Sequence, residues 1–244
     1  MTPEQAANNA QSQMNGAGVP CRVAQAQLRG RNADLEEVYE VACASGMGYV
    51  VAATSPPQVT DCVTIAGRAE MAKRSDPAAA PLECRITANQ NVTGMVTAYA
   101  REAGVGCNID QAAMAGTSIA GNAVYEVGCE GADGYWIEKA STGWLLTPCV
   151  KVAALTNTCR FTTKTEQTSS LKSWLAGTTA SACDVTDVRY MGANAGGAFY
   201  EAKCGAGDGF VARFDNAMTV QQVIPCAQAT GIGGGCKLGM PPQS

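Results

Sequence analysis

Three stretches of the chain carry apolar residues at the three-to-four-residue spacing of an amphipathic helix. Each stretch follows a threonine that can cap a helix, and a glutamine or glutamate three residues later completes a capping box. Each stretch also reaches a glycine, which favours helix termination. We therefore predict three helices, with N-caps at Thr2, Thr87 and Thr163 and ends at Gly16, Gly104 and Gly177.

Each predicted helix is followed by residues that alternate between apolar and polar, as in a half-buried strand. In the first such stretch, Tyr39, Val41 and Cys43 share one face, and Glu40 and Ala42 share the other. This is the second strand of the unit, because a strand from the first cysteine and a turn rich in glycine and asparagine precede it. A third strand and a short fourth strand follow it. The fold class predicted is α+β, with one helix packed on a small antiparallel sheet of three to four strands in each unit.

The same unit recurs along the chain, which is the strongest organisational signal in the sequence. Tyr39-Glu-Val-Ala-Cys43 returns as Tyr125-Glu-Val-Gly-Cys129 and, 75 residues later, as Tyr200-Glu-Ala-Lys-Cys204. All twelve cysteines fall into one frame of four positions per unit. We predict three tandem disulfide-stapled repeats, at residues 1–83, 84–158 and 159–244.

The cysteine frame favours pairing the first cysteine with the second and the third with the fourth. The midpoint between each first and second cysteine falls in a turn-like segment, as a hairpin requires. The favoured pairs are Cys21–Cys43, Cys62–Cys84, Cys107–Cys129, Cys149–Cys159, Cys183–Cys204 and Cys226–Cys236. The alternative joins each fourth cysteine to the next first one, as in Cys84–Cys107, and leaves Cys21 and Cys236 as odd ends. The sequence alone leaves both schemes open.

Composition argues against catalysis, metal binding and nucleic-acid binding. The 244 residues include no histidine, so the commonest general base and the commonest metal ligand are missing. No C-x-x-C motif occurs, which disfavours zinc ribbons, iron–sulfur clusters and redox centres. The net charge of −4 does not suit a nucleic acid or an anionic membrane. We therefore expect no enzymatic activity, no metal and no cofactor.

The even number of cysteines predicts an oxidising location, which is the periplasm, the cell surface or the medium. Residues 1–18 are polar and rich in alanine, without the apolar stretch of a leader, and no apolar run elsewhere has the length of a membrane span. We expect a leader, and any anchor with it, to have been removed.

One glutamate recurs in every unit, three residues before the second cysteine. One hypothesis makes it a binding position that is presented three times. The hypothesis we favour makes it the cross-strand partner of the basic residue after each fourth cysteine. The glutamates are Glu40, Glu126 and Glu201, and the basic residues are Arg85, Arg160 and Lys237.

Two further polar motifs are interpreted as architecture. Asp133 and Asp208 lie in glycine-rich segments that supply too few oxygen ligands for calcium, so we predict turn aspartates. The glycines between Gly231 and Gly235 lack the lysine of a phosphate-binding loop and lie between two cysteines, which predicts a tight disulfide loop.

Three features belong to one unit only. Trp136 and Trp144 flank a turn in the second unit, and we take both as partner-binding candidates, with packing between repeats as the alternative. Residues Arg68 to Pro81 form an insertion in the first unit, and their charged, alanine-rich composition predicts an exposed loop.

These observations predict a secreted or periplasmic cell-envelope protein, non-catalytic, whose repeats contact a protein partner. An accessory subunit of an envelope or surface assembly fits this description. The order of elements is similar to that of bacterial β-lactamase-inhibitor-type repeats and PepSY-type domains, without shared motif residues. This similarity implies a second hypothesis, in which the sheet faces cover an enzyme's active site or bind a glycan.

Overall fold

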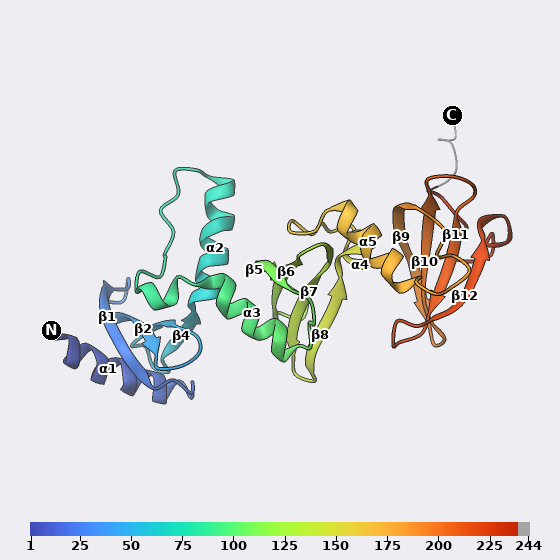
Figure 1. Cartoon of the computed structure of the whole chain (residues 1–244). Helices are drawn as coiled ribbons and strands as arrows, with labels where there is room; N and C mark the ends of the chain where they lie inside the picture. The colour runs from blue at the N-terminus through green and yellow to red at the C-terminus, as the bar shows by residue number, and fades with distance from the viewer. Residues whose placement is uncertain (239–244) are drawn as a thin grey trace. The chain divides into compact units, whose positions relative to one another are not determined.

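A computed structural model describes residues 1–238 and shows an α+β protein (Figure 1). Within these residues lie three four-stranded antiparallel sheets, five α-helices and six disulfide bonds. The α+β class predicted from the sequence is confirmed. The chain divides into two compact units, residues 1–104 with 112–125 and residues 105–111 with 126 onward.

The first sheet is a meander in which every strand pairs with its neighbour in the chain. Helix α1 (Pro3–Gly16) contacts this sheet, whose strands are β1 (Val23–Arg31), β2 (Glu37–Cys43), β3 (Tyr49–Ala52) and β4 (Gln58–Asp61). Ala10 and Met14 of α1 are buried against Tyr39, Val41 and Val51 of the sheet. The apolar face of the helix and one face of the sheet therefore pack together in one core, as the two hydrophobic patterns require.

The other two sheets repeat this strand order. The second has strands β5 (Ile109–Thr117), β6 (Ala123–Cys129), β7 (Ala132–Ala140) and β8 (Gly143–Pro148), and α3 (Val92–Glu102) precedes it. The third has strands β9 (Val185–Asn194), β10 (Gly197–Cys204), β11 (Phe210–Phe214) and β12 (Val220–Pro225), and α5 (Lys164–Trp174) precedes it. In the third core, Tyr200 meets the rings of Trp174, Tyr190 and Phe214 at centroid distances of 5.4–5.9 Å.

Two of the three predicted helix starts are confirmed. Thr2 and Thr163 cap α1 and α5 in complete capping boxes. The third prediction is wrong, because Thr87 opens the short 3-10 helix η1 (Thr87–Asn89), and α3 begins only at Val92, with Asn91 as its N-cap. The Asn89 amide donates to the Glu40 carboxylate and to the Val41 carbonyl. These bonds hold η1 on the first sheet, so α3 begins after it rather than at Thr87.

A helix of variable length also begins at each third cysteine, and the sequence did not predict it. These helices are α2 (Cys62–Ser75), α4 (Cys149–Ala154) and the 3-10 helix η2 (Cys226–Gln228). The insertion Arg68 to Pro81 is therefore not simply an exposed loop, since residues 68–75 continue α2. Asp61 caps α2, and the buried Ile65 and Ala69 give it an apolar side, which together favour helix over loop.

The six disulfides join each first cysteine to the second and each third to the fourth. Cys84 is bonded to Cys62, so the structure does not contain the alternative Cys84–Cys107 link. The Cα atoms of the bonded pairs lie 5.3–5.9 Å apart, within the range that unstrained bridges adopt.

Two of the bridges allow a matched comparison of loop length. Cys62–Cys84 spans 22 residues and Cys149–Cys159 spans 10, and the third cysteine of each is buried. By the chain-entropy relation, the first should contribute about 3.4 kcal/mol and the second about 2.7 kcal/mol. We expect Cys62→Ala/Cys84→Ala to lower the free energy of unfolding by more than Cys149→Ala/Cys159→Ala in urea titrations without reductant. A larger loss from the shorter bridge would contradict this order.

Candidate functional site

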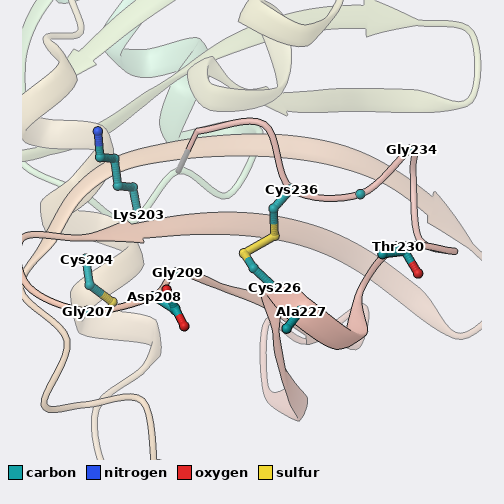
Figure 2. Close-up of a pocket in the computed structure, with 11 residues that line it drawn as sticks. Lys203, Cys204, Gly207, Asp208, Gly209, Cys226, Ala227, Thr230, Gly234 and Cys236 are labelled. Carbon is teal, nitrogen blue, oxygen red and sulfur yellow. A yellow bond between two sulfur atoms is a disulfide. The ribbon is translucent and has the colours of Figure 1, made fainter. Parts of the chain in front are cut away.

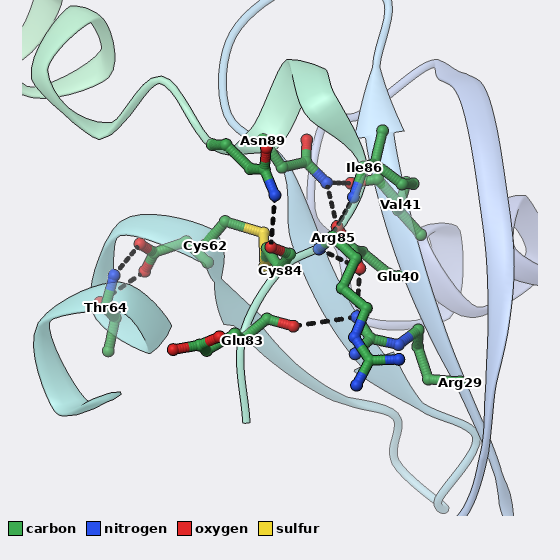
Figure 3. The surroundings of a disulfide bond; sticks show 12 residues. Arg29, Glu40, Val41, Cys62, Thr64, Glu83, Cys84, Arg85, Ile86 and Asn89 are labelled. Atoms are coloured by element: carbon green, nitrogen blue, oxygen red, sulfur yellow. Dashed lines mark hydrogen bonds and ion pairs between the residues drawn. A yellow bond between two sulfur atoms is a disulfide. The ribbon is translucent and has the colours of Figure 1, made fainter. Parts of the chain in front are cut away.

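Glu40 on β2 lies at the centre of a polar cluster of the first sheet (Figure 3). Its carboxylate is fully buried and accepts the backbone N–H groups of Arg85 at 2.8 Å and Ile86 at 2.7 Å. The Asn89 amide donates to it at 3.0 Å, and the Arg29 guanidinium forms an ion pair with it. Burial alone would raise the pKa of Glu40, but these donors outweigh burial and the pKa is lowered.

The second and third sheets contain the same arrangement. Glu126 accepts the N–H groups of Arg160 and Phe161, and Glu201 accepts those of Lys237 and Leu238 at 2.6 Å. The accompanying cations are Arg160 and Arg189, respectively. We call each such set, a buried glutamate that accepts two successive N–H groups after a fourth cysteine, a glutamate clamp.

The clamps correct the favoured hypothesis about the basic residue after each fourth cysteine. That residue supplies its backbone N–H in all three clamps, but its side chain is the paired cation only at Arg160. In the other two clamps the cation comes from the first strand of the sheet, as Arg29 or Arg189. The hypothesis of an acidic binding position that is presented three times is not supported either, because all three carboxylates are buried and accept backbone N–H groups.

Two of these glutamates lie close to a disulfide. Carboxylate and sulfur atoms come within 4.8 Å of one another in the set of Glu40, Cys62 and Cys84, and a second such set surrounds Glu201. The sulfurs are already bonded to each other, and the carboxylates already accept several N–H groups. Since a metal needs thiolates and free lone pairs, these sets do not suit one while the disulfides are formed.

Asp133 differs from its predicted turn position, because β7 begins at Ala132 and draws it into the sheet. Its Oδ2 accepts the Val150 N–H at 3.2 Å near the start of α4, and its own N–H donates to Ser170 Oγ at 2.7 Å. Oδ1 is buried without a hydrogen-bond partner. Burial raises the pKa of Asp133 to about 7, and the Glu166 charge adds to the rise although the Val150 N–H opposes it.

Asp208, by contrast, lies in the turn between β10 and β11, as predicted. It lines a cavity of about 450 Å³, together with Gly209, Ala227 and Thr230. In Figure 2 the Cys226–Cys236 disulfide is drawn between Asp208 and Thr230. Gly234 and Gly235 of the loop between these cysteines form another part of the lining, which places the predicted disulfide loop at the edge of a cavity.

Trp136 and Trp144 are not brought together. Trp136 is opposite Thr147 and Trp144 is opposite Lys139 in the β7–β8 ladder, so the two indoles project from different faces of the sheet. Trp136 shares its face with Glu126, since its Nε1 donates to that carboxylate at 3.4 Å. Trp144 lies under the Lys139 ammonium, 5.2 Å from the ring centroid. Each indole is half-buried, and each stays a separate partner-binding candidate.

Comparison with known proteins adds no family to this description. Scans against protein-family models, curated proteins and solved structures found no significant match to the chain. Within residues 1–238, no helix has the length and apolar character needed to cross a membrane. The six disulfides indicate an oxidising compartment.

Proposed function

We propose that this chain is a non-catalytic protein of the cell envelope, periplasmic, surface-located or secreted, whose three tandem repeats contact a protein partner. The observation that carries the proposal is the use of the three glutamate clamps. The buried carboxylates of Glu40, Glu126 and Glu201 accept backbone N–H groups of segments that follow a disulfide. Carboxylates that hold the backbone in place support an architectural role for these glutamates.

The clamps act at the boundaries between the proposed repeats. Glu40 belongs to the first repeat and holds Arg85 and Ile86, which open the second. Glu126 belongs to the second and holds Arg160 and Phe161, which open the third. Each of these two clamps thus fixes the entry of the next repeat directly after a disulfide, and the Glu201 clamp holds the corresponding segment inside the third repeat. This arrangement suits a binding protein whose repeats each contact their neighbours.

The partner surface is proposed at the second repeat, where the two tryptophans give two alternative faces. Trp136 shares its face with Leu145, and Trp144 shares the other with Leu146. Both leucines are exposed on β8, so each face combines an aromatic side chain with an accessible apolar one. Protein interfaces concentrate their binding energy in such anchors.

Affinity capture from an envelope fraction, without reductant, tests the proposal. We expect one protein to be enriched, and we expect Trp136→Ala or Trp144→Ala, but not both, to weaken its binding. The loss should be about 30-fold, which corresponds to the 2 kcal/mol typical of an aromatic anchor. Leu145→Ser and Leu146→Ser should identify the same face.

Leu35→Ser is the matched control, because Leu35 is an exposed leucine in the turn between β1 and β2. It should bind the partner like the unaltered chain. Equal enrichment by the native and the reduced, unfolded chain would contradict a protein partner. Binding that is lost equally in the control would contradict the proposed surface.

A further inference from the structure

The junction between the first and second repeats packs helix α2 against the next sheet. Met114 lies seven residues after the first cysteine of its repeat, and its side chain contacts Gly67 of α2. A Cβ atom on Gly67 would come within 2.5 Å of the Met114 Cβ, so the contact is close. The Tyr99 hydroxyl of α3 also donates to the Met47 sulfur of the first repeat at 3.6 Å.

The junction between the second and third repeats again uses the residues that lie seven positions after a first cysteine and four positions after a second cysteine, with other helix residues as their partners. Tyr190, again seven residues after a first cysteine, faces the Lys151 ammonium of α4 at 5.5 Å. Val150, which follows a third cysteine, is buried in the core of the third repeat. Ser170 of α5 accepts the Asp133 N–H, and Asp133 lies four residues after a second cysteine, as Met47 does.

In the third repeat, the surface that corresponds to the Asp133 and Val150 side of this junction is exposed. Asp208 lies four residues after its second cysteine, and Ala227 directly follows its third. These are the positions of Asp133 and Val150, yet Asp208 and Ala227 line the 450 Å³ cavity of Figure 2. Asp208 and Ala227 are exposed, whereas Asp133 and Val150 are each 3% exposed.

In the first repeat, the surface that corresponds to the opposite side of these junctions is exposed. Leu28 lies seven residues after its first cysteine, at the position of Met114 and Tyr190. Leu28 is 42% exposed, whereas Met114 is 4% exposed beneath α2. Asn9 of α1 is exposed and lies seven residues after the N-cap Thr2, as Ser170 lies seven residues after Thr163.

We propose that the cavity beside Cys226–Cys236 receives the α1 and β1 face of a second copy of this chain. The inference rests on the proposed function, in which tandem repeats contact a protein partner, and it identifies that partner as a second copy of the chain. Leu28 of the second copy packs on the segment that begins at Ala227, as Tyr190 lies against Lys151, the residue after Val150. Its Asn9 side-chain oxygen accepts the Asp208 N–H, as Ser170 accepts that of Asp133. The contact joins two different surfaces, so it is heterologous and continues from copy to copy.

Sedimentation velocity of the oxidised chain over a range of concentrations tests this assembly. We expect a series of oligomers that lengthens with concentration, and we expect Leu28→Arg and Ala227→Arg each to be monomeric alone. Mixed in equal amounts, the two variants should form a dimer and nothing larger, because each retains the half that the other lacks. Both substitutions replace exposed side chains, so folding should be unaffected.

Ile119→Arg and Ala217→Arg are the matched controls, since both residues are exposed and lie in turns outside these surfaces. Both should assemble like the unaltered chain. A chain that stays monomeric at millimolar concentration would overturn the inference, as would variants that fail to dimerise on mixing. A monomer that still captures a different protein from the envelope would overturn this inference while leaving the proposed function standing.

Discussion

Replacing Glu40 by alanine is expected to lower the free energy of unfolding by about 3–5 kcal/mol, the loss typical when one partner of a buried ion pair is removed. The substitution leaves the Arg85 and Ile86 N–H groups, the Asn89 amide and the Arg29 guanidinium without their shared acceptor. Urea unfolding of the oxidised variant would measure the loss. Glu83→Ala provides the control, because Glu83 forms an exposed ion pair with Lys73 and such pairs contribute at most about 1 kcal/mol.

Glu40→Gln keeps the shape of the side chain while removing its charge, and it gives a local test of the clamp. We expect faster hydrogen exchange at the Arg85 and Ile86 amides, with the amides of α1 unchanged. The lowered pKa also sets a pH dependence. The Glu40 contribution is present above the unfolded pKa, near 4.3, and disappears as pH falls through the folded pKa. Unchanged exchange and an unchanged acid response in the variant would contradict the clamp.

Raising the pH from about 4 to about 7 is expected to destabilise the chain through Asp133, by up to about 4 kcal/mol. The pKa of Asp133 is raised by burial to about 7 in the folded chain, whereas an unfolded aspartate has a pKa near 3.9. The folded state therefore holds this proton over the interval, and stability falls with each pH unit until Asp133 is ionised. Above pH 7 this contribution becomes constant.

Asp133→Asn should abolish that slope, because asparagine fills the same space and stays neutral. Its side-chain oxygen retains the acceptor for the Val150 N–H at the start of α4. We expect similar stability at pH 4 and a more stable variant at pH 8, measured by urea unfolding at each pH. Asp208→Asn is the matched control, because Asp208 is exposed in a turn and should leave the slope in place. A slope that persists in Asp133→Asn would assign it to another group.

Secondary structure was predictable where local chemistry decides it. The capping boxes at Thr2 and Thr163 marked two helices, because a cap and its third residue interact within one turn. The same reasoning failed at Thr87, since the nearby Asn89 bonds to Glu40, 49 residues away. It failed again at residues 68–75, where burial of Ile65 and Ala69 supports a helix that composition did not reveal.

The polar residues show the same division. Glu40, Glu126 and Glu201 were recognisable as recurring positions, but their acceptor role depends on backbone that returns from 34 to 46 residues away. Asp133 and Asp208 looked alike in sequence. The structure separates them, since Asp133 is closed in by α4 and α5 whereas Asp208 lines an open cavity.

The sequence by itself determined the disulfide chemistry, the alternation of helix and strands and the positions of the recurring glutamates. These depend on residue type and on spacing along the chain, both of which are visible without a fold. Tertiary structure alone decided the cysteine partners, the buried ion pairs and the face on which each tryptophan lies. Those properties depend on which distant segments meet and in which register, and a shift of one residue in a ladder would exchange the two faces.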